Sequence, residues 1–286
     1  MTSTLRQLFA KYVAELTSAG IDQAEAEIEL ILCHLLGIDR LKLYLDGDTL
    51  LTEEVLRRFE EIIERRKTRY PLQYILDESW FYGRRFFVSP AVMVPTPETE
   101  LLVETVIRLV TKRQWACPRI LDIGVGSGVI SVTLANELDD CRITGLDVSK
   151  EALAVAGRNA DSLGGGSKID LRESDFFSSV KADERFDLIV SNPPYIREGD
   201  YPGLPPEVLE DPKISLTAGE DGLDAIRVIL REGPRFLAPG GRILFEIGED
   251  QADLVGELTA EDERYTTITI LRDLNDRDRV VMLGCD

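Results

Sequence analysis

A strand followed by a glycine-rich turn and a helix, between residues 119 and 135, limits the folds open to this chain more than any other feature. The apolar run from Ile120 to Ile123 leads into Gly124-Val125-Gly126-Ser127-Gly128, and a helical pattern begins at Val129. Glycines at alternate positions allow the backbone to turn sharply and to approach a ligand closely. Short β-branched runs and helical patterns keep alternating after this unit, which is typical of a doubly wound parallel sheet.

The same alternation predicts the remaining strands. Further parallel strands are expected at residues 142–147, 169–172, 186–190 and 242–247. Runs at 266–271 and 279–283 are joined by a short polar turn and predict an antiparallel pair. A helix is predicted from Leu223 to about Leu237, ended by Pro239-Gly240-Gly241. The predicted fold is therefore α/β, with a doubly wound, mostly parallel sheet and an antiparallel edge strand.

Residues 1–70 instead carry helical periodicity and predict a small helical bundle. Gly20 and Gly37 are expected to end the first two helices, and Thr52-Glu53-Glu54 resembles the start of a third. Nothing in this bundle looks catalytic, so it either packs against the rest of the chain or docks a partner. The prediction favours an N-terminal helical substrate-docking domain.

The aromatic and β-branched segment at residues 71–97 predicts a β-hairpin linker, with strands near 82–88 and 91–95. Thr96 is expected to cap a helix whose first residue is Pro97. Residues 98–286 then form the α/β domain. A Pro- and Gly-rich connection at residues 198–222 is longer than an ordinary loop, which predicts a lid or a binding loop.

The composition of the 286 residues excludes several classes of protein. With 44% hydrophobic and 30% charged residues the chain is globular, and no apolar run approaches the length of a membrane span. The first residues lack a signal-peptide core, so a cytoplasmic location is expected. The single histidine, His34, lies in a helical pattern, and the four cysteines lack metal spacing, so neither a histidine base nor a metal is expected. A formal net charge of −19 disfavours non-specific binding to nucleic acid.

A second feature, Asn192-Pro193-Pro194-Tyr195, directly follows the apolar run from Phe186 to Val190. Open α/β sheets bind ligands at such strand ends. Consecutive prolines hold the chain extended and donate no N–H, so the Asn192 amide oxygen and the Pro193 carbonyl form two adjacent acceptors. Such a pair suits a planar NH2 group, which carries two donors. A simple turn after the strand is the alternative interpretation.

The glycine turn is unsuited to a pyrophosphate. Its last spacing is Gly126-x-Gly128, and Asp122 lies close before it, where its charge would repel an anion. Asp147, at the end of the second strand, stands where a carboxylate accepts hydrogen bonds from ribose hydroxyls. A nucleoside with a positive charge and no phosphate indicates S-adenosylmethionine. Asp175 and Phe176 would serve its adenine. Packing remains the alternative for Phe176, a helix cap for Asp147 and loop bracing for Asp122.

The residues predicted to bind this cofactor are Gly124, Val125, Gly126, Ser127, Gly128, Asp147, Phe176 and Asn192. After transfer of its methyl group the cofactor would leave as S-adenosylhomocysteine.

Several segments together resemble the HemK-type release factor glutamine methyltransferases, which belong to the class I S-adenosylmethionine-dependent fold. The segments that carry the resemblance are Pro71-Leu72-Gln73-Tyr74-Ile75, Phe81-Tyr82-Gly83, Pro97-Glu98-Thr99-Glu100, the glycine turn, Asn192-Pro193-Pro194-Tyr195, Pro239-Gly240-Gly241, Glu246-Ile247-Gly248 and Asp278-Arg279-Val280-Val281. The chain departs from the family pattern at Thr96, where Arg is usual, and at Asp77 and Asp276, where Gly is usual.

The resemblance implies methylation of the side-chain nitrogen (N5) of the glutamine in the Gly-Gly-Gln loop of class I peptide chain release factors. Asn192, Pro193 and Tyr195 would be catalytic, and Asn192, Pro193, Pro194 and Tyr195 would bind the glutamine. The partner would be the release factor, without direct contact to nucleic acid or membrane, and a monomer is expected.

Three alternatives remain open from the sequence. A methyltransferase acting on adenine N6 of DNA or RNA would use the same acceptors, but it should carry a basic recognition region. A close relative would methylate a glutamine of a ribosomal protein. A non-catalytic cofactor-binding scaffold would have no need of paired amide acceptors. Identification of the methylated molecule separates the first two, and a turnover assay tests the third.

Overall fold

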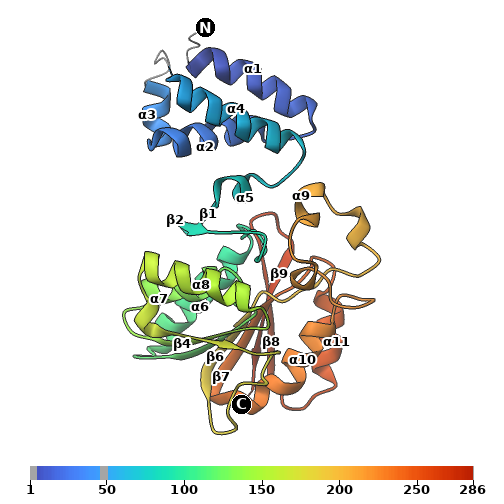
Figure 1. Ribbon diagram of the computed structural model, residues 1–286. Coiled ribbons are helices and arrows are strands. Elements are labelled where there is room, and N and C mark those ends of the chain that lie inside the picture. The colour runs from blue at the N-terminus through green and yellow to red at the C-terminus, as the bar shows by residue number, and fades with distance from the viewer. Residues whose placement is uncertain (1–4, 46–50, 286) are drawn as a thin grey trace. The chain divides into compact units, whose positions relative to one another are not determined.

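The computed structural model describes residues 5–45 and 51–285 (Figure 1). The chain forms two compact units. Unit 1 comprises Met1–Asp77 and Pro205–Glu210, and unit 2 comprises Glu78–Leu204 and Asp211–Asp286. Among the helices of the described residues, none has the length and apolar character needed to cross a membrane.

Unit 1 is helical, as its periodicity predicts. Its helices are α1 (Leu5–Ser18), α2 (Ala24–Leu36), α3 (Arg40–Leu45), α4 (Glu53–Lys67) and α5 (Leu72–Leu76). Leu16, Ile28 and Phe59 are fully buried in its core. The predicted cap of the third helix is confirmed, because the Thr52 side chain accepts the Val55 N–H at 3.3 Å. The short helices α3 and α5 were not among the predicted ones, because helices this short carry little periodicity.

Unit 1 also contains a short helix from much later in the chain, α9 (Pro206–Leu209). Arg66 and Arg69 of the first segment bind Glu207 of this helix. Arg66 Nη2 lies 2.8 Å from Glu207 Oε1, and Arg69 Nη2 lies 2.7 Å from Glu207 Oε2. Arg66 is also paired with Glu27 of α2, with Nε 2.6 Å from Oε2. Two guanidinium groups therefore hold the returning segment in unit 1.

Unit 2 opens with a hairpin made of β1 (Glu78–Phe81) and β2 (Arg84–Phe87). A hairpin is present, and the strand predicted near 82–88 corresponds to β2, but the strand predicted at 91–95 was wrong and the partner of β2 precedes it in the chain. Tyr82 and Gly83 have φ of 49° and 70° and form the two-residue turn itself, so the first strand precedes them. Residues 91–95 form no strand; four of them, Ala91, Val92, Met93 and Pro95, line the cavity described below.

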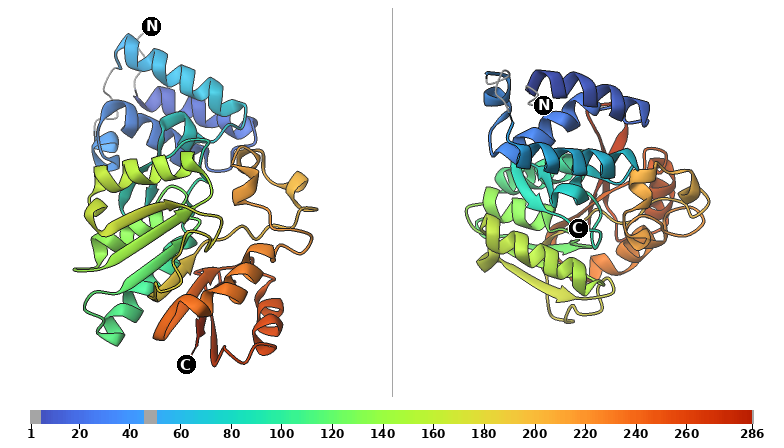
Figure 2. Two further views of the ribbon diagram at one scale, coloured as in Figure 1. Left: turned by 60° about the horizontal axis from the view of Figure 1, so that its bottom comes forward. Right: turned by 45° about the horizontal axis from the view of Figure 1, so that its top comes forward.

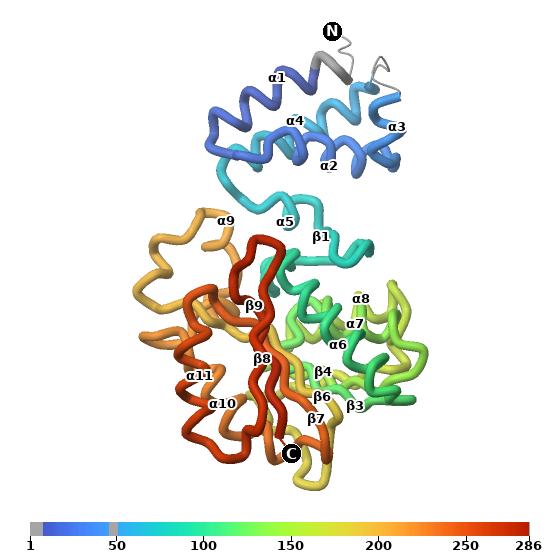
Figure 3. Tube along the Cα trace, turned by 180° about the vertical axis from the view of Figure 1, so that it is seen from behind, coloured from blue at the N-terminus to red at the C-terminus, as the bar shows by residue number. Residues whose placement is uncertain are grey.

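A seven-stranded sheet forms the centre of unit 2. Its strands are β3 (Arg119–Ile123), β4 (Arg142–Asp147), β5 (Ile169–Glu173), β6 (Phe186–Ser191), β7 (Leu237–Glu246), β8 (Thr267–Arg272) and β9 (Asp278–Gly284). The order is β5-β4-β3-β6-β7-β9-β8, and the first five strands pair in parallel. β9 pairs antiparallel with both of its neighbours. The predicted α/β class and the antiparallel pair at the sheet edge are confirmed, with β9 one position in from the edge (Figure 3).

Helices cover both faces of this sheet (Figures 1 and 2). The helices are α6 (Thr99–Arg113), α7 (Val129–Glu137), α8 (Lys150–Leu163), α10 (Asp224–Glu232) and α11 (Ala252–Ala260). Leu102 of α6 and Ile130 of α7 belong to one core cluster, and Ile226 of α10 and Val255 of α11 belong to another. The sheet is therefore buried on both faces, which is why its parallel strands read as nearly continuous apolar runs.

Two predicted boundaries near these elements were wrong. Helix α10 ends at Glu232, a 3-10 turn follows at Gly233–Phe236, and Pro239-Gly240-Gly241 lies inside β7 rather than after a helix. Gly240 has φ of 76° at a register shift between β6 and β7, which is the conformation of a bulge. Helix α6 begins at Thr99 rather than Pro97, although the Thr99 N–H already bonds the Thr96 carbonyl at 3.3 Å.

Asp77 and Asp276 both adopt the left-handed backbone conformation, with φ of 56° and 60°. Asp77 is the residue that ends α5, and Asp276 lies in the turn between β8 and β9. These are the two positions where the sequence carries Asp in place of the usual Gly. Glycine enters this region without steric cost, and Asp is one of the few other residues that tolerate it. The departures therefore preserve the backbone geometry.

Candidate active site

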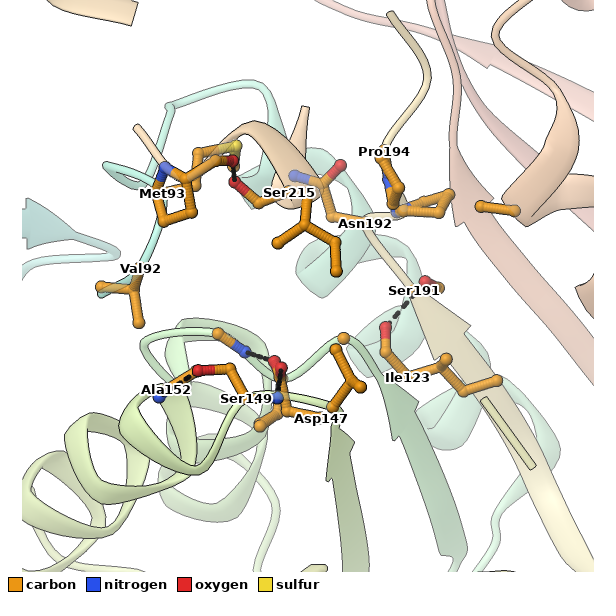
Figure 4. Close-up of a pocket in the computed structure, with 18 of the residues that line it drawn as sticks. Val92, Met93, Ile123, Asp147, Ser149, Ala152, Ser191, Asn192, Pro194 and Ser215 are labelled. Carbon is orange, nitrogen blue, oxygen red and sulfur yellow. Dashed lines mark hydrogen bonds between the residues drawn. The ribbon is translucent and has the colours of Figure 1, made fainter. Parts of the chain in front are cut away.

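A cavity of about 580 Å³ opens in unit 2 where β3, β4 and β6 end (Figure 4). It brings together ten residues that the sequence predicts for the cofactor and the substrate, namely Gly124, Val125, Gly126, Ser127, Asp147, Asp175, Phe176, Asn192, Pro193 and Pro194. Two other predicted residues, Gly128 and Tyr195, do not line it. The glycine turn follows β3 and Asn192-Pro193-Pro194 follows β6, and these two strands are parallel neighbours. Both motifs therefore line the same cavity although they lie 60 to 70 positions apart in the chain.

The glycine turn is held in a conformation that needs glycine. Gly124, Gly126 and Gly128 have φ of 74°, 53° and 82°. The N–H groups of Gly124 and Val125 both bond the Leu146 carbonyl at 2.8 Å. A Cβ at Gly124 would meet no atom within 4 Å, whereas one at Gly128 would lie 3.3 Å from Ala156 of α8. Gly124 therefore leaves space open in the cavity, and Gly128 permits close packing of α7 on α8.

Asp147 joins the glycine turn to the start of α8. Its Oδ2 accepts the Gly126 N–H and its Oδ1 accepts the Ser149 N–H, both at 2.9 Å (Figure 4). The cap of α8 is Ser149, whose hydroxyl accepts the Ala152 N–H at 3.1 Å. The helix-cap alternative for Asp147 therefore does not hold. Its carboxylate faces the cavity with one backbone bond to each oxygen, and each oxygen has a further lone pair for a ligand.

Phe176 lies at the cavity wall beside Asp175, after β5. Its φ of 46° is unusual for an aromatic residue. The Ser174 hydroxyl donates to the Phe176 carbonyl at 2.7 Å, and the Ser179 N–H donates to the Ser174 hydroxyl at 3.0 Å. A strained residue held by its neighbours is typical of a binding site.

Asn192 and Pro193 present the pair of acceptors that the sequence predicts. The Asn192 Nδ2 donates to Thr99 Oγ1 at 3.0 Å, which commits that end of the amide. Within the described parts of the chain, no group donates a hydrogen bond to Asn192 Oδ1 or to the Pro193 carbonyl. Both residues line the cavity. Two oxygens are therefore available there for a ligand with two N–H hydrogens.

Behind Asn192 lies a buried carboxylate, Glu246, at the end of β7. Its Oε2 accepts the Thr99 hydroxyl at 2.8 Å, and its Oε1 accepts the Tyr195 hydroxyl at 3.2 Å. Burial raises the pKa of Glu246 to about 7, although the Thr99 hydrogen bond and the charge of Arg279 lower it. The Tyr195 side chain is thus engaged by Glu246 rather than lining the cavity.

Asp122 is fully buried beneath the glycine turn. Its Oδ2 accepts the Ser131 hydroxyl of α7 at 2.6 Å, and its Oδ1 has no partner among the described residues. Burial raises the pKa of Asp122 to about 7. The bond to Ser131 ties the strand before the turn to the helix after it, so the loop-bracing interpretation describes this contact.

The connection at residues 198–222 returns to the cavity. The Ile196 N–H bonds the Leu216 carbonyl at 2.9 Å, and the Ala218 N–H bonds the Ile196 carbonyl at 3.0 Å. Gln251 Nε2 bonds the carbonyls of Tyr195 and Gly222 at 3.0 and 3.2 Å. This segment contributes Pro212, Ile214, Ser215, Thr217, Ala218 and Gly219 to the cavity lining. Its predicted contribution to a binding site is consistent with this placement.

Sequence reasoning missed several residues of the site. Ala91, Val92, Met93 and Pro95 line the cavity although they were predicted to form a strand. Figure 4 shows Val92 and Met93 there. Thr99 lines it too, and it was placed only in a helix start. Pro95 and Pro97 argue against a strand at 91–95, because proline is disfavoured in the interior of a strand.

Two family models match this chain. The model described as "PrmC N-terminal domain" matches residues 7–76, and "Methyltransferase small domain" matches residues 97–219. The relatives are similar over nearly their whole length. A release factor glutamine methyltransferase of Cereibacter sphaeroides is 42% identical over 94% of this chain and 94% of its own. One of Geobacter sulfurreducens is 41% identical over 88% of this chain and 87% of its own.

Solved structures share the fold at low identity. The 16S rRNA N2 G1207 methyltransferase of T. thermophilus, in complex with AdoMet and guanosine, has a TM-score of 0.53 and 17% identity over 73% of this chain and 50% of its own. A methyltransferase of Pyrococcus furiosus has a TM-score of 0.50 and 17% identity over 82% and 98%. These confirm the methyltransferase fold of unit 2. The two family models and the relatives above confirm the resemblance seen in the sequence: the chain belongs to the release factor glutamine methyltransferase family.

Proposed function

We propose that this methyltransferase transfers a methyl group from S-adenosylmethionine to the side-chain N5 of the glutamine in the Gly-Gly-Gln loop of a class I release factor. The observation that carries the proposal is the pair of free acceptors, Asn192 Oδ1 and the Pro193 carbonyl, in the cavity that the glycine turn also lines. Family membership supports the choice of a release factor glutamine over other NH2 groups.

The residues of the cavity fit the cofactor. The open space above Gly124 and Gly126 admits a ligand against the backbone, and Asp147 has lone pairs for the two ribose hydroxyls. Phe176 supplies an apolar face and Asp175 an acceptor for adenine. When bound, S-adenosylmethionine supplies an electrophilic methyl group on a positively charged sulfonium. The nearby carboxylates tolerate that charge, whereas they would repel a pyrophosphate.

Asn192 and Pro193 would compensate for the weak nucleophilicity of the glutamine amide nitrogen. The amide nitrogen shares its lone pair with the carbonyl and is therefore a poor nucleophile. Acceptors placed on both N–H hydrogens fix the direction of the nitrogen and stabilise positive charge that develops on it. After the nitrogen has gained the methyl carbon, it releases one proton to water. Pro194 lies beside the two acceptors in the lining and helps to exclude solvent.

Glycines beside the target glutamine make physical sense in this site. A side chain that enters a cavity must bring its own backbone close to the enzyme, and glycine permits that approach. The segment at 212–219 and residues 91–93 supply apolar walls for such a loop, including the exposed Ile214. The cytoplasmic location and the monomeric state stay predictions of the sequence.

We further propose that residues 1–70 dock the protein substrate. None of the residues described for unit 1 lines the cavity, yet unit 1 exposes large apolar side chains at Leu41 and Leu45. The double variant Leu41→Ser/Leu45→Ser should raise KM for an intact release factor and leave KM for a short Gly-Gly-Gln peptide unchanged. Leu274→Ser, which removes a fully exposed leucine of unit 2, is the matched control. An equal effect on both substrates would contradict a docking role.

Mass spectrometry of a class I release factor, after incubation with enzyme and labelled S-adenosylmethionine, tests the proposed reaction. We expect one methyl group on the Gly-Gly-Gln glutamine. Replacement of that glutamine by asparagine should abolish transfer, because the shorter side chain withdraws the nitrogen by about an ångström. Label on a ribosomal protein, or on adenine of DNA or RNA, with none on the release factor, would replace the proposal by the corresponding alternative.

A further inference from the structure

Four polar side chains behind the cavity form one connected set of hydrogen bonds. Asn192 Nδ2 lies 3.0 Å from Thr99 Oγ1, Thr99 Oγ1 lies 2.8 Å from Glu246 Oε2, and the Tyr195 hydroxyl lies 3.2 Å from Glu246 Oε1. Thr99 is 2% exposed and Glu246 is 1% exposed. Thr99 belongs to α6 and Glu246 to β7, whereas Asn192 and Tyr195 follow β6. The tertiary fold therefore brings the four side chains together.

The chemistry of the four groups determines which of them donates and which accepts in each hydrogen bond. An ionised carboxylate only accepts hydrogen bonds, so the Thr99 hydroxyl must donate its single hydrogen to Glu246. Thr99 Oγ1 then offers only lone pairs to Asn192. The Nδ2 end of the Asn192 amide carries hydrogens and is the end that can bond it, so Oδ1 must take the other position.

The opposite orientation of the Asn192 amide would be inactive. It would turn the Nδ2 hydrogens toward the substrate, where they would meet the N–H hydrogens of the glutamine amide. Donor against donor forms no hydrogen bond and leaves buried polar groups unsatisfied. The two orientations of an amide have nearly the same shape, so packing alone does not select between them, whereas hydrogen bonding does.

We propose that Thr99 and Glu246 are positioning residues that select the reactive orientation of the Asn192 amide, with Tyr195 holding the second oxygen of Glu246. This inference rests on the proposed function, since it concerns how the substrate NH2 group is received. It assigns to Thr99 of the Pro97-Glu98-Thr99-Glu100 segment, and to Tyr195, roles that do not require contact with the substrate. Both act through a neighbour.

The protonation state of Glu246 makes the orientation of the Asn192 amide depend on pH. Glu246 faces Thr99 and Tyr195 directly, Arg279 of β9 attracts its negative charge, and Glu98 repels it. Burial raises its pKa to about 7. A protonated Glu246 can donate a hydrogen to Thr99, which frees the Thr99 hydroxyl to donate to Asn192 Oδ1 and removes the selection. The rate should therefore fall as the pH drops below about 7.

The test compares Thr99→Val, Thr99→Ser and Thr105→Val in the full-length enzyme. Valine keeps the shape of threonine and removes the hydroxyl, so Thr99→Val should lower kcat for a Gly-Gly-Gln peptide about 10- to 100-fold. Thr99→Ser should restore most of kcat. Thr105, on the same helix α6, donates only to the Leu101 carbonyl and does not line the cavity, so Thr105→Val is the matched control and should keep the normal kcat.

Two further measurements separate positioning from a general structural effect. Calorimetry should find the same Kd for S-adenosylmethionine in Thr99→Val and wild type, with the same melting temperature as Thr105→Val. In an Asn192→Ala background, Thr99→Val should cause no further loss of kcat, because the group it orients is gone. Glu246→Gln provides a second variant, since its NH2 group can donate to Thr99; it should lower kcat and abolish the acidic fall of the rate near pH 7.

Each outcome bears on one hypothesis. Normal kcat in Thr99→Val, or losses that add to those of Asn192→Ala, would overturn the positioning role while the wild-type enzyme still methylates the peptide. A wild-type enzyme that methylates no glutamine would instead overturn the proposed function. A kcat of Thr99→Ser as low as that of Thr99→Val would also contradict the inference, because serine retains the hydroxyl.

Discussion

Arg66 Nη2 lies 2.8 Å from Oε1 of Glu207, and the two residues are separated by 141 positions in the chain. Burial alone would raise the pKa of Glu207, but hydrogen bonds from Arg69 and Arg66 outweigh it and lower the pKa to about 2. The ion pairs therefore stabilise the folded state above about pH 4.5, and this stability is lost as the pH falls toward 2.

Glu207→Gln should lower the free energy of unfolding by about 1–3 kcal/mol at pH 7, because it leaves the buried Arg66 with less compensation. The difference from wild type should shrink at pH 2 to 3. Urea unfolding at the two pH values measures it, and Glu210→Gln, an exposed neighbour in the same segment, is the control. A loss that is independent of pH would contradict the ion-pair explanation.

The buried Asp122 predicts the opposite dependence on pH. Because burial raises its pKa to about 7, the folded state keeps a proton there that the unfolded state has already lost above about pH 4. Stability should fall as the pH rises from about 4 to 7. Asp122→Asn should remove this penalty and raise the free energy of unfolding by about 1–3 kcal/mol at pH 8, with little change near pH 4. Equal effects at both pH values would argue against an ionised Asp122.

Asp147→Ala should weaken S-adenosylmethionine by about 1.5–3 kcal/mol, the cost of losing hydrogen bonds to a charged acceptor. Calorimetry measures the change. The same carboxylate also holds Gly126 and Ser149, so the melting temperature must be followed alongside. Asp183→Ala, which removes an exposed carboxylate after β5, should leave the affinity unchanged. Wild-type affinity in a folded Asp147→Ala variant would contradict the assignment.

Asp77 tests the cost of a left-handed residue at the end of α5. Its φ of 56° suits glycine and penalises alanine. Asp77→Gly should therefore be more stable than Asp77→Ala by about 1 kcal/mol, as thermal or urea unfolding of the two variants would show. Equal stability would mean that the backbone relaxes out of this conformation.

Local patterns predicted much of this molecule. The strands β3, β4 and β6 are mostly apolar runs, because helices cover both faces of a parallel sheet. Asn192 and the glycine turn could be placed in one cavity because parallel strands end at the same edge. Each of these conclusions depends on short segments and on one general rule of sheet geometry.

The wrong predictions concern segments whose structure depends on contacts with residues far away in the chain. Pro239-Gly240-Gly241 looked like a helix stop, but opposite Asp187 it forms a bulge in β7, and a Cβ at Gly241 would lie 3.0 Å from the Asp187 carbonyl oxygen. Thr99 looked like part of a helix start, and its partners Asn192 and Glu246 lie 93 and 147 positions away. No local spacing encodes such contacts.

The returning helix α9 also sets an order of events during synthesis. Unit 1 consists of an N-terminal segment and Pro205–Glu210, so the ribosome makes most of the first methyltransferase strands before Glu207 exists. At roughly 5–20 residues per second, Arg66 and Arg69 wait about 7 to 30 seconds for this partner. During that interval the two guanidinium groups lack it. A nascent chain arrested before Pro205 should therefore have an N-terminal segment that proteases cut more readily than in the finished protein.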